Sequence, residues 1–285
     1  MENLVRTLIY NGQVSLTVAD TTNIVQTGIN RHHLSEISAY VLGKALSALT
    51  FMSACLKSDR GDISLALKGD GPYGEIGISG NKLLNIRGFI GNTALEGGAN
   101  EGAEIAALGE NSAITVIRDD GFNRPFVGSC ALPKGGGIDE GFEEYFRISE
   151  QLPTRIKTVV ELDENGNCIF AGFAVLQPLP FTEESVLNEV ENVDLGALLS
   201  AVKTQGVAES VSQRFAVNKE VWELREARYQ CHCSRDYILE VLVSLGEAQM
   251  RQIIDEDGSV KVHCHYCNTD YEFTHEDADA LFPKK

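Results

Sequence analysis

The pattern of apolar and polar positions predicts a sheet-rich domain over residues 1–177. Leu4–Tyr10 and Val14–Ala19 read as two strands joined by Asn11-Gly12, a strong hairpin signal. A long helix is expected over residues 35–57, where apolar positions recur at helical spacing. Many strands with few helices between them favour an α+β fold with an antiparallel or mixed sheet. The other elements expected here are strands at 63–67, 74–78, 83–90, 113–117, 126–130, 155–162 and 168–176, and a helix at 139–150.

A helical region follows. Pro178 and Pro180 mark a boundary, after which residues 182–205 and 207–215 repeat apolar side chains at helical spacing. The apolar face is broad, but a stretch of about 50 residues is too small for a core of its own. We therefore expect a helical linker over residues 178–229 that docks on the sheet as a layer. The layer could be packed permanently, or it could be one that is released.

Residues 230–285 form a third region, made of short elements. Ser234 is expected to cap a helix that ends at Gly246, and Thr274 to cap a final helix. Between them lie a second helix at 247–255 and β-like stretches at 260–263 and 271–273. The chain is thus predicted to contain a core domain (1–177), a linker (178–229) and a small C-terminal domain (230–285).

Composition and charge narrow the possible functions. The 285 residues are 43% hydrophobic and 23% charged, which is ordinary for a globular protein. A net charge of -17 without a basic patch disfavours binding to nucleic acid. The first residues lack the features of a secretion signal, and the most apolar window, 37–56, contains Lys44 and reads as a buried helix rather than a membrane span. We expect a cytoplasmic protein without a membrane partner.

One glycine motif has an ordinary explanation. Gly69-Asp-Gly-Pro-Tyr-Gly74 matches the spacing of a dinucleotide-binding loop, but that loop must open a helix. Here a β-like run follows Pro72, so the motif is interpreted as a turn between strands.

The cysteines carry the chemistry. Three of the seven stand apart among apolar residues and are interpreted as small buried hydrophobic side chains: Cys55, Cys130 and Cys168. The other four form Cys-x-Cys and, thirty residues later, Cys-x-x-Cys. Two close pairs can bring four thiolates to one tetrahedral ion, which is how structural zinc sites are built, and soft sulfur ligands select zinc or iron over calcium or magnesium. We therefore predict one zinc ion per chain, held by Cys231, Cys233, Cys264 and Cys267.

This site should control the folding of the C-terminal domain. A segment of about 55 residues is near the size at which a hydrophobic core is marginal, whereas zinc–thiolate binding contributes roughly 10–16 kcal/mol. Thiolates are also the atoms that oxidants attack, so the site could be a structural staple or a redox switch. One nearby histidine could replace a cysteine ligand, although four thiolates already fill the sphere; the candidates are His232, His263, His265 and His275.

The motifs around these cysteines resemble those of a known protein family. Cys231-His-Cys-Ser-Arg follows shortly after Trp222-Glu-Leu-Arg225, and Val-His-Cys264-His-Tyr-Cys267 follows an Asp-Glu-Asp-Gly turn. Upstream lie Tyr145-Phe-Arg-Ile-Ser-Glu-Gln-Leu-Pro-Thr154 and the glycine motif described above. Over essentially the whole chain, the sequence resembles the redox-regulated 33 kDa heat-shock chaperonins, a family of bacterial cytosolic holdases.

The resemblance implies a function. The reduced, zinc-bound protein would be inactive, and oxidation would form the disulfides Cys231–Cys233 and Cys264–Cys267 with release of zinc. The C-terminal domain would unfold, the linker would lose its support, and apolar surface would become available to unfolding or oxidatively damaged client proteins. Such a protein is not an enzyme, requires no ATP, and is active as a homodimer.

Two other functions remain open from the residues alone. A thiol–disulfide oxidoreductase could use either cysteine pair, but neither pair follows a strand in a βαβ unit. The second alternative is a zinc-ribbon binding module in which zinc has a purely structural role. The acidic surface disfavours nucleic acid as the partner of such a module.

Overall fold

The structure is a computed structural model that describes residues 2–217 and 219–282. The chain divides into two compact units, Met1–Gln230 and Cys231–Lys285. Each unit has a hydrophobic core of its own. The expected α+β class is confirmed, with strands and helices mixed in both units.

Two sheets form the frame of the first unit. The five-stranded sheet has the order β10-β1-β2-β9-β8, and the six-stranded sheet has the order β11-β5-β4-β3-β6-β7. Their strands are β1 (Leu4–Ile9), β2 (Val14–Asp20), β3 (Asp62–Lys68), β4 (Glu75–Asn81), β5 (Asn85–Ile90), β6 (Ala113–Asp119), β7 (Phe126–Ala131), β8 (Arg155–Leu162), β9 (Cys168–Pro178), β10 (Glu223–Arg225) and β11 (Arg228–Tyr229). Neighbouring strands are antiparallel except for β11, which runs parallel to β5. The predicted hairpins β1–β2 and β8–β9 are both present.

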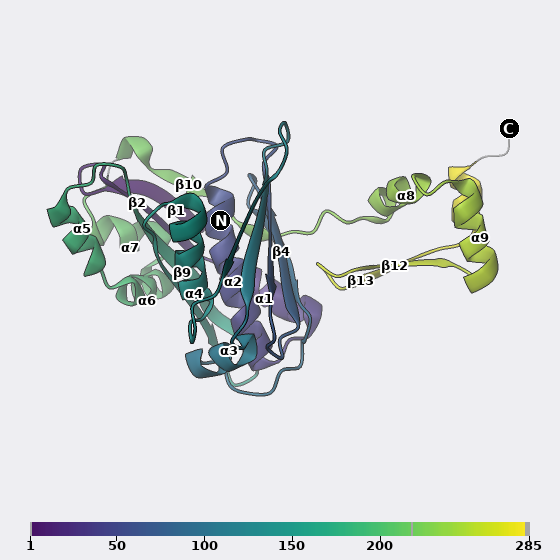
Figure 1. Cartoon of the computed structure of the whole chain (residues 1–285), viewed down its shortest axis with the longest axis horizontal. Coiled ribbons are helices and arrows are strands. Elements are labelled where there is room, and N and C mark those ends of the chain that lie inside the picture. Colours follow the sequence, from purple (N-terminus) through teal and green to yellow (C-terminus); the bar gives the residue numbers. More distant parts are fainter. Residues whose placement is uncertain (1, 218, 283–285) are drawn as a thin grey trace. The chain divides into compact units, whose positions relative to one another are not determined.

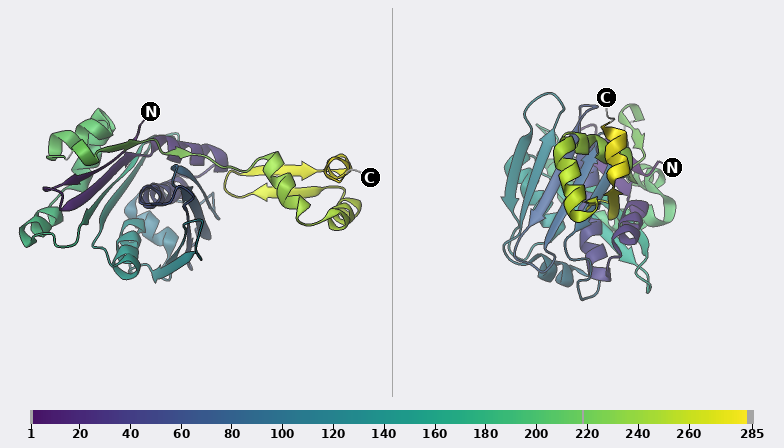
Figure 2. Two further views of the ribbon diagram at one scale, coloured as in Figure 1. Left: turned by 90° about the horizontal axis from the view of Figure 1, so that it is seen from above. Right: turned by 90° about the vertical axis from the view of Figure 1, so that its right-hand side faces the viewer.

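A layer of helices lies between the two sheets (Figures 1 and 2). Its members are α1 (Thr22–His32), α2 (Glu36–Ala54), α3 (Glu101–Leu108), α4 (Ile138–Tyr145) and a π-helical turn, Phe146–Glu150. Helix α2 contacts β8 and β9 on one side and β3, β4 and β5 on the other, which explains why it is buried on nearly all sides. It is also the one helix among the described residues that is long and apolar enough to cross a membrane, and 94% of that stretch is buried inside the protein.

The expected helical layer covers the outer face of the five-stranded sheet (Figure 1). It consists of α5 (Glu184–Glu191), α6 (Leu195–Gln205) and α7 (Val207–Arg214). Apolar side chains of α6 such as Leu198 and Val202 pack with Leu16 of β2 and Leu176 of β9 in a second hydrophobic core. The sheet is therefore buried on both faces, which accounts for the nearly continuous burial of successive residues in β2 and β9.

Two short strands after this layer were not predicted from the sequence. β10 extends the five-stranded sheet beside β1, and β11 extends the six-stranded sheet beside β5. The intervening Ala227 is buried in the main core. One segment thus forms an edge of both sheets.

The second unit is a hairpin with three helices. The hairpin is β12 (Val260–Cys264) with β13 (Thr269–Phe273), and the helices are α8 (Arg235–Val243), α9 (Glu247–Asp257) and α10 (His275–Leu281). Its core is small and is built around Ile238, Met250, Ile254 and Phe273. The predicted caps are present: the Ser234 hydroxyl accepts a hydrogen bond from the Tyr237 amide, and Asp277 accepts one from the amide of Thr274.

Candidate metal centre

Four sulfur atoms converge in the second unit. The ligand atoms of the two cysteine pairs all lie within 4.8 Å of one another. The sulfur of Cys233 is 3.3 Å from that of Cys231 and 3.1 Å from that of Cys267, and the sulfur of Cys231 is 3.8 Å from that of Cys264. A tetrahedral zinc ion with bonds of about 2.3 Å requires sulfur–sulfur separations of about 3.8 Å. The four positions therefore fit a single metal ion.

Local structure places each pair. Cys231 and Cys233 lie in the extended segment that leads to Ser234, the N-cap of α8. Cys264 ends β12, and the chain turns back so that the amides of Cys267 and Asn268 donate hydrogen bonds to the Cys264 carbonyl, at 3.3 and 2.8 Å. This tight turn brings the second pair of sulfurs to one side of the hairpin. A Cys-x-x-Cys motif suits metal binding for this reason: the turn places both sulfurs next to the same ion.

Polar side chains surround the sulfurs. The Tyr271 hydroxyl lies 3.4 Å from the sulfur of Cys233, and the Thr269 hydroxyl lies 3.3 Å from the sulfur of Cys267. Hydroxyl groups at these distances can donate hydrogen bonds to thiolates and stabilise their charge. Both residues belong to β13, and their role near the sulfurs was not predicted from the sequence.

An arginine braces the site from outside. Arg235, the first residue of α8, donates a hydrogen bond to the Glu272 carbonyl at 2.8 Å and binds both carboxylate oxygens of Asp277, at 2.7 and 2.8 Å. Its guanidinium also lies 4.6 Å from the ring centre of Phe273. The start of α8 is thereby attached to β13 and α10, close to the first cysteine pair.

Two nearby histidines have other partners. The Nδ1 atom of His263 lies 2.7 Å from a carboxylate oxygen of Asp270, and Nε2 of His275 lies 3.2 Å from one of Asp255. Among the described residues, the group of side chains that could hold a metal contains cysteines alone.

The electrostatics of the site favour a cation. Burial raises the pKa of the thiols of Cys264 and Cys267, and the sulfurs of Cys231 and Cys233 raise both pKa values further. Several thiolates in one buried space repel one another unless a positive charge compensates them. A divalent ion supplies that charge and binds thiols in their deprotonated form. The donor set thus fits a metal ion that prefers sulfur.

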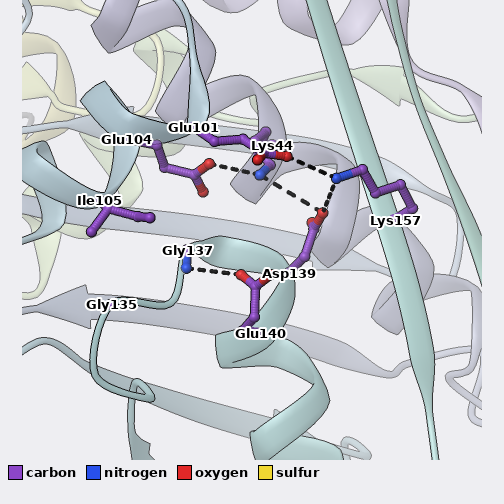
Figure 3. Close-up of a pocket in the computed structure, with 9 residues that line it drawn as sticks. All are labelled: Lys44, Glu101, Glu104, Ile105, Gly135, Gly137, Asp139, Glu140 and Lys157. Atoms are coloured by element: carbon purple, nitrogen blue, oxygen red, sulfur yellow. Dashed lines mark hydrogen bonds and ion pairs between the residues drawn. The ribbon is translucent and has the colours of Figure 1, made fainter. Parts of the chain in front are cut away.

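A second group of ionisable side chains lies in the first unit, among α2, α3, α4 and β8 (Figure 3). Lys44 Nζ is 2.7 Å from an oxygen of Glu104 and 3.7 Å from one of Asp139, and all three side chains are buried. Lys157 Nζ, closer to the surface, lies 3.8 Å from Asp139 and 3.0 Å from Glu101.

This cluster is a structural brace. Burial raises the pKa of Glu104 and of Asp139. Burial opposes the charge of Lys44, yet the two carboxylates together raise its pKa, because one cation is shared between two anions. Glu104 also accepts the Ile138 amide, and Asp139 the amide of Thr158. The adjoining cavity of about 50 Å³ has room for a few water molecules.

Comparisons with known proteins agree along the whole chain. A family model described as Hsp33 protein matches residues 2–274. A 33 kDa chaperonin of Bacillus mycoides is 31% identical over 288 residues, covering 99% of this chain and 98% of that protein. One from Bacillus cereus is 30% identical over 285 residues, with coverage of 98% and 97%.

A solved structure has the same fold. The crystal structure of the 33 kDa chaperonin (heat shock protein 33 homolog) from Thermotoga maritima superposes with a TM-score of 0.82 at 25% sequence identity. The match covers 98% of this chain and 97% of that one. The chain therefore belongs to the Hsp33 protein family, and this membership supports a chaperone function.

Proposed function

We propose that this protein is an ATP-independent holdase whose activity is controlled by oxidation of the four clustered cysteines. The observation that carries the proposal is the convergence of four sulfurs within 4.8 Å in a unit with a small core, in a chain of the Hsp33 family. In the reduced protein the site keeps the second unit folded, and client-binding surface stays covered. Oxidation removes that support.

Zinc is the metal that the site suits best. Four cysteine thiolates form the usual ligand set of structural zinc sites, and Cys231, Cys233, Cys264 and Cys267 would all be ligands. Bound zinc compensates the thiolate charges and cross-links the start of α8 to the β12–β13 turn. Free thiolates persist only in a reducing compartment, which agrees with a cytoplasmic location.

Oxidation acts on the cysteine side chains themselves. Two cysteines lose two electrons and their thiol protons to form one disulfide, and a peroxide accepts the electrons and protons and becomes two molecules of water. We assign the pairs Cys231–Cys233 and Cys264–Cys267, because one or two intervening residues keep these sulfurs near each other even in an unfolded chain. A sulfur in a disulfide no longer serves as a thiolate ligand, so the oxidised unit loses its cross-link.

The helical layer connects this event to client binding. Helices α5–α7 cover an apolar face of the five-stranded sheet that includes Val5, Leu16 and Leu176. The layer contributes few contacts beyond this face and is followed by the segment that leads to Cys231. When the second unit unfolds, the layer loses its C-terminal support and exposes apolar surface. Such surface binds unfolding or oxidatively damaged proteins and prevents their aggregation.

The active form is proposed to be a homodimer, because two copies present a larger continuous surface to one client. Sedimentation of the oxidised protein at micromolar concentration should show a dimer, whereas the reduced protein should be mostly monomeric. A monomer under oxidising conditions, with full protection of clients, would remove this part of the proposal.

The central test compares two forms of the same protein. Light scattering of a heat-denatured client is followed with the reduced, zinc-loaded protein and with protein treated with peroxide, while a chromogenic chelator reports released zinc. We expect protection by the oxidised form alone, in proportion to zinc release. The variant Cys130→Ala, which alters a cysteine outside the cluster, is the matched control and should behave like the unmodified protein. Equal protection by both forms would leave the zinc with a structural role only.

A further inference from the structure

The segment of residues 223–230, here called the strap, occupies the edges of both sheets. Its β10 part pairs antiparallel with β1, with Arg225 opposite Leu4. Its β11 part pairs parallel with β5, with Tyr229 opposite Ile86. A strand at the edge of a sheet binds its neighbour through backbone groups, so another extended chain can replace it.

Backbone hydrogen bonds hold the strap along its length. The amides of Arg228 and Gln230 donate to the carbonyls of Leu84 and Ile86, at 3.0 and 2.9 Å. At the point where the strap passes from one sheet to the other, the Asn3 side chain takes the place of a strand. Its Nδ2 donates to the Ala227 carbonyl at 3.0 Å and its Oδ1 accepts the Ala227 amide at 2.8 Å.

Alternate side chains of the strap point into the protein. Arg225 donates hydrogen bonds to the backbone carbonyls of Ala54 and Lys82. Ala227 is buried, with 4% of its surface exposed. The side chains between and after them, those of Glu226 and Arg228, are exposed. The inward positions therefore accept a basic residue, then a small one.

The third inward position accepts an aromatic residue. The Tyr229 hydroxyl donates a hydrogen bond to the Gly88 carbonyl at 3.0 Å and lies 3.3 Å from Nε2 of His32. The ring passes beside Gly28 of α1, where an added Cβ would come within 3.8 Å of it. The strap thus fills a slot lined by α1 and β5 that suits a tyrosine.

The position of the strap in the chain connects it to the metal centre. Gln230, which makes the last hydrogen bond of the β11 ladder, immediately precedes Cys231. When the chain around Cys231 is held, the end of this ladder is held too. When that chain unfolds, the strap can open from its C-terminal end, because terminal hydrogen bonds of a short ladder open first.

We propose that the edges of β1 and β5, once the strap has left them, bind an extended segment of a client protein as an added strand. The segment replaces the backbone hydrogen bonds of the strap and places a basic, a small and an aromatic side chain at alternate positions, as Arg225, Ala227 and Tyr229 do now. This inference rests on the proposed function, since oxidation is what releases the strap. In the reduced protein the strap is a competitor attached to the same chain, and its high effective concentration keeps clients out.

Unfolding proteins supply what this site requires. Their backbone groups are unpaired, whereas those of folded proteins are mostly satisfied within their own sheets and helices. The net charge of -17 also favours segments that carry basic residues. The edge therefore discriminates between unfolded and folded proteins by backbone availability, and the slots add a preference among unfolded segments.

A labelled peptide with the sequence of residues 222–230, Trp-Glu-Leu-Arg-Glu-Ala-Arg-Tyr-Gln, tests the site directly. Fluorescence anisotropy should show binding to the oxidised full-length protein at least tenfold tighter than to the reduced protein. Peptides carrying Ala227→Arg or Tyr229→Ala should bind at least tenfold more weakly than the parent peptide. A heat-unfolded client should displace the parent peptide.

The outcomes separate this inference from the proposed function. If the oxidised protein prevents aggregation but does not bind the peptide, the edge is not the client site and the holdase proposal stands. If the oxidised protein does not prevent aggregation, the holdase proposal itself fails. Equal binding of the peptide to the reduced and oxidised proteins would also overturn the inference, because the strap would not be a gate.

A photo-crosslinking residue locates the bound peptide. It is placed at Leu83, an exposed position next to β5, and as a control at Phe126 of β7, which is exposed at the opposite edge of the same sheet. We expect crosslinks to the peptide from position 83 and in the oxidised protein only. Crosslinks from position 126 alone would show that clients bind another edge and would overturn the assignment.

Discussion

The two units of this protein are held together in different ways. The first has two extensive hydrophobic cores, one between its sheets and one beneath α5–α7. The second has a small core around Met250 and Phe273, and it is also cross-linked by four converging cysteines and by ion pairs such as Arg235–Asp277 and Arg251–Asp279. A large apolar core does not depend on the redox state of the cell, whereas a thiolate cluster does. We therefore expect oxidation to unfold the second unit and to leave the first intact.

The difference also explains where a switch can be placed. A unit that depends on one metal site changes state when a few sulfur atoms react, and it needs no large rearrangement of packed side chains. The three cysteines of the first unit, Cys55, Cys130 and Cys168, lie outside the cluster. Burial raises the pKa of all three thiols, that of Cys168 to about 12. These thiols stay protonated at neutral pH and react slowly with oxidants.

Removal of the metal should have the largest effect. Treatment with a strong chelator under reducing conditions should unfold residues 231–282, since structural zinc–thiolate sites contribute roughly 10–16 kcal/mol to folding. Hydrogen exchange followed by mass spectrometry should show loss of protection in α8–α10 and β12–β13, and continued protection in α2 and β3. Addition of zinc should restore the second unit. Slow exchange in the metal-free second unit would contradict the comparison.

In the first unit, we expect the largest loss of stability when a buried charge is removed. The variant Lys44→Met leaves Glu104 and Asp139 buried without their cation and should destabilise the first unit by about 3–5 kcal/mol. The pKa of Lys44 is higher in the folded protein than in the unfolded chain. Its charge therefore stabilises the first unit fully at any pH below the unfolded-state pKa. This stabilisation is lost only as the pH rises through the folded-state pKa. The midpoint of urea unfolding at neutral pH measures the loss.

Lys157→Met is the matched control for this change. Its side chain is 38% exposed, so the loss of its ion pairs should cost no more than about 1 kcal/mol. Equal destabilisation by the two substitutions would show that burial of Lys44 is not what makes it important.

Substitutions that create similar cavities should have different consequences in the two units. Met250→Ala and Leu198→Ala each remove a fully buried side chain and should each cost about 2–5 kcal/mol. In the second unit this loss is a large share of the stability, so Met250→Ala should lower the peroxide concentration at which zinc is released. Leu198→Ala should instead loosen the helical layer and raise the binding of a hydrophobic dye by the reduced protein. The absence of any shift in zinc release for Met250→Ala would contradict the idea that the small core is limiting.

The smallest expected effect concerns a helix cap next to the site. Ser234→Ala removes the acceptor for the Tyr237 amide at the start of α8 and should cost about 1 kcal/mol. Ser234→Asp keeps an acceptor there and should restore the stability of the second unit. Thermal unfolding of the reduced protein, monitored in the second unit by hydrogen exchange, measures both changes.

Several elements were predictable because their signals are local. The β1–β2 hairpin, the β8–β9 hairpin and α2 follow from alternation, turn residues and helical spacing. The four clustered cysteines were likewise identified from spacing alone, and the structure brings their sulfurs together. Helices α1 and α3 were missed, because α1 has few large apolar residues and contains Gly28, and α3 is short and contains Gly102. The strap was missed as well, because strands of two or three residues have no periodicity.

The amino-acid sequence by itself determined the class of fold, the docking of an amphipathic layer and the presence of four sulfur ligands, since periodicity and cysteine spacing are properties of neighbouring residues. Only the tertiary structure decided which edges the strap occupies, that Lys44 lies between two buried carboxylates, and that Tyr271 and Arg235 support the cysteine cluster. These features join residues far apart in the chain. Long-range contacts depend on how the layers pack, and that packing is a property of the whole molecule.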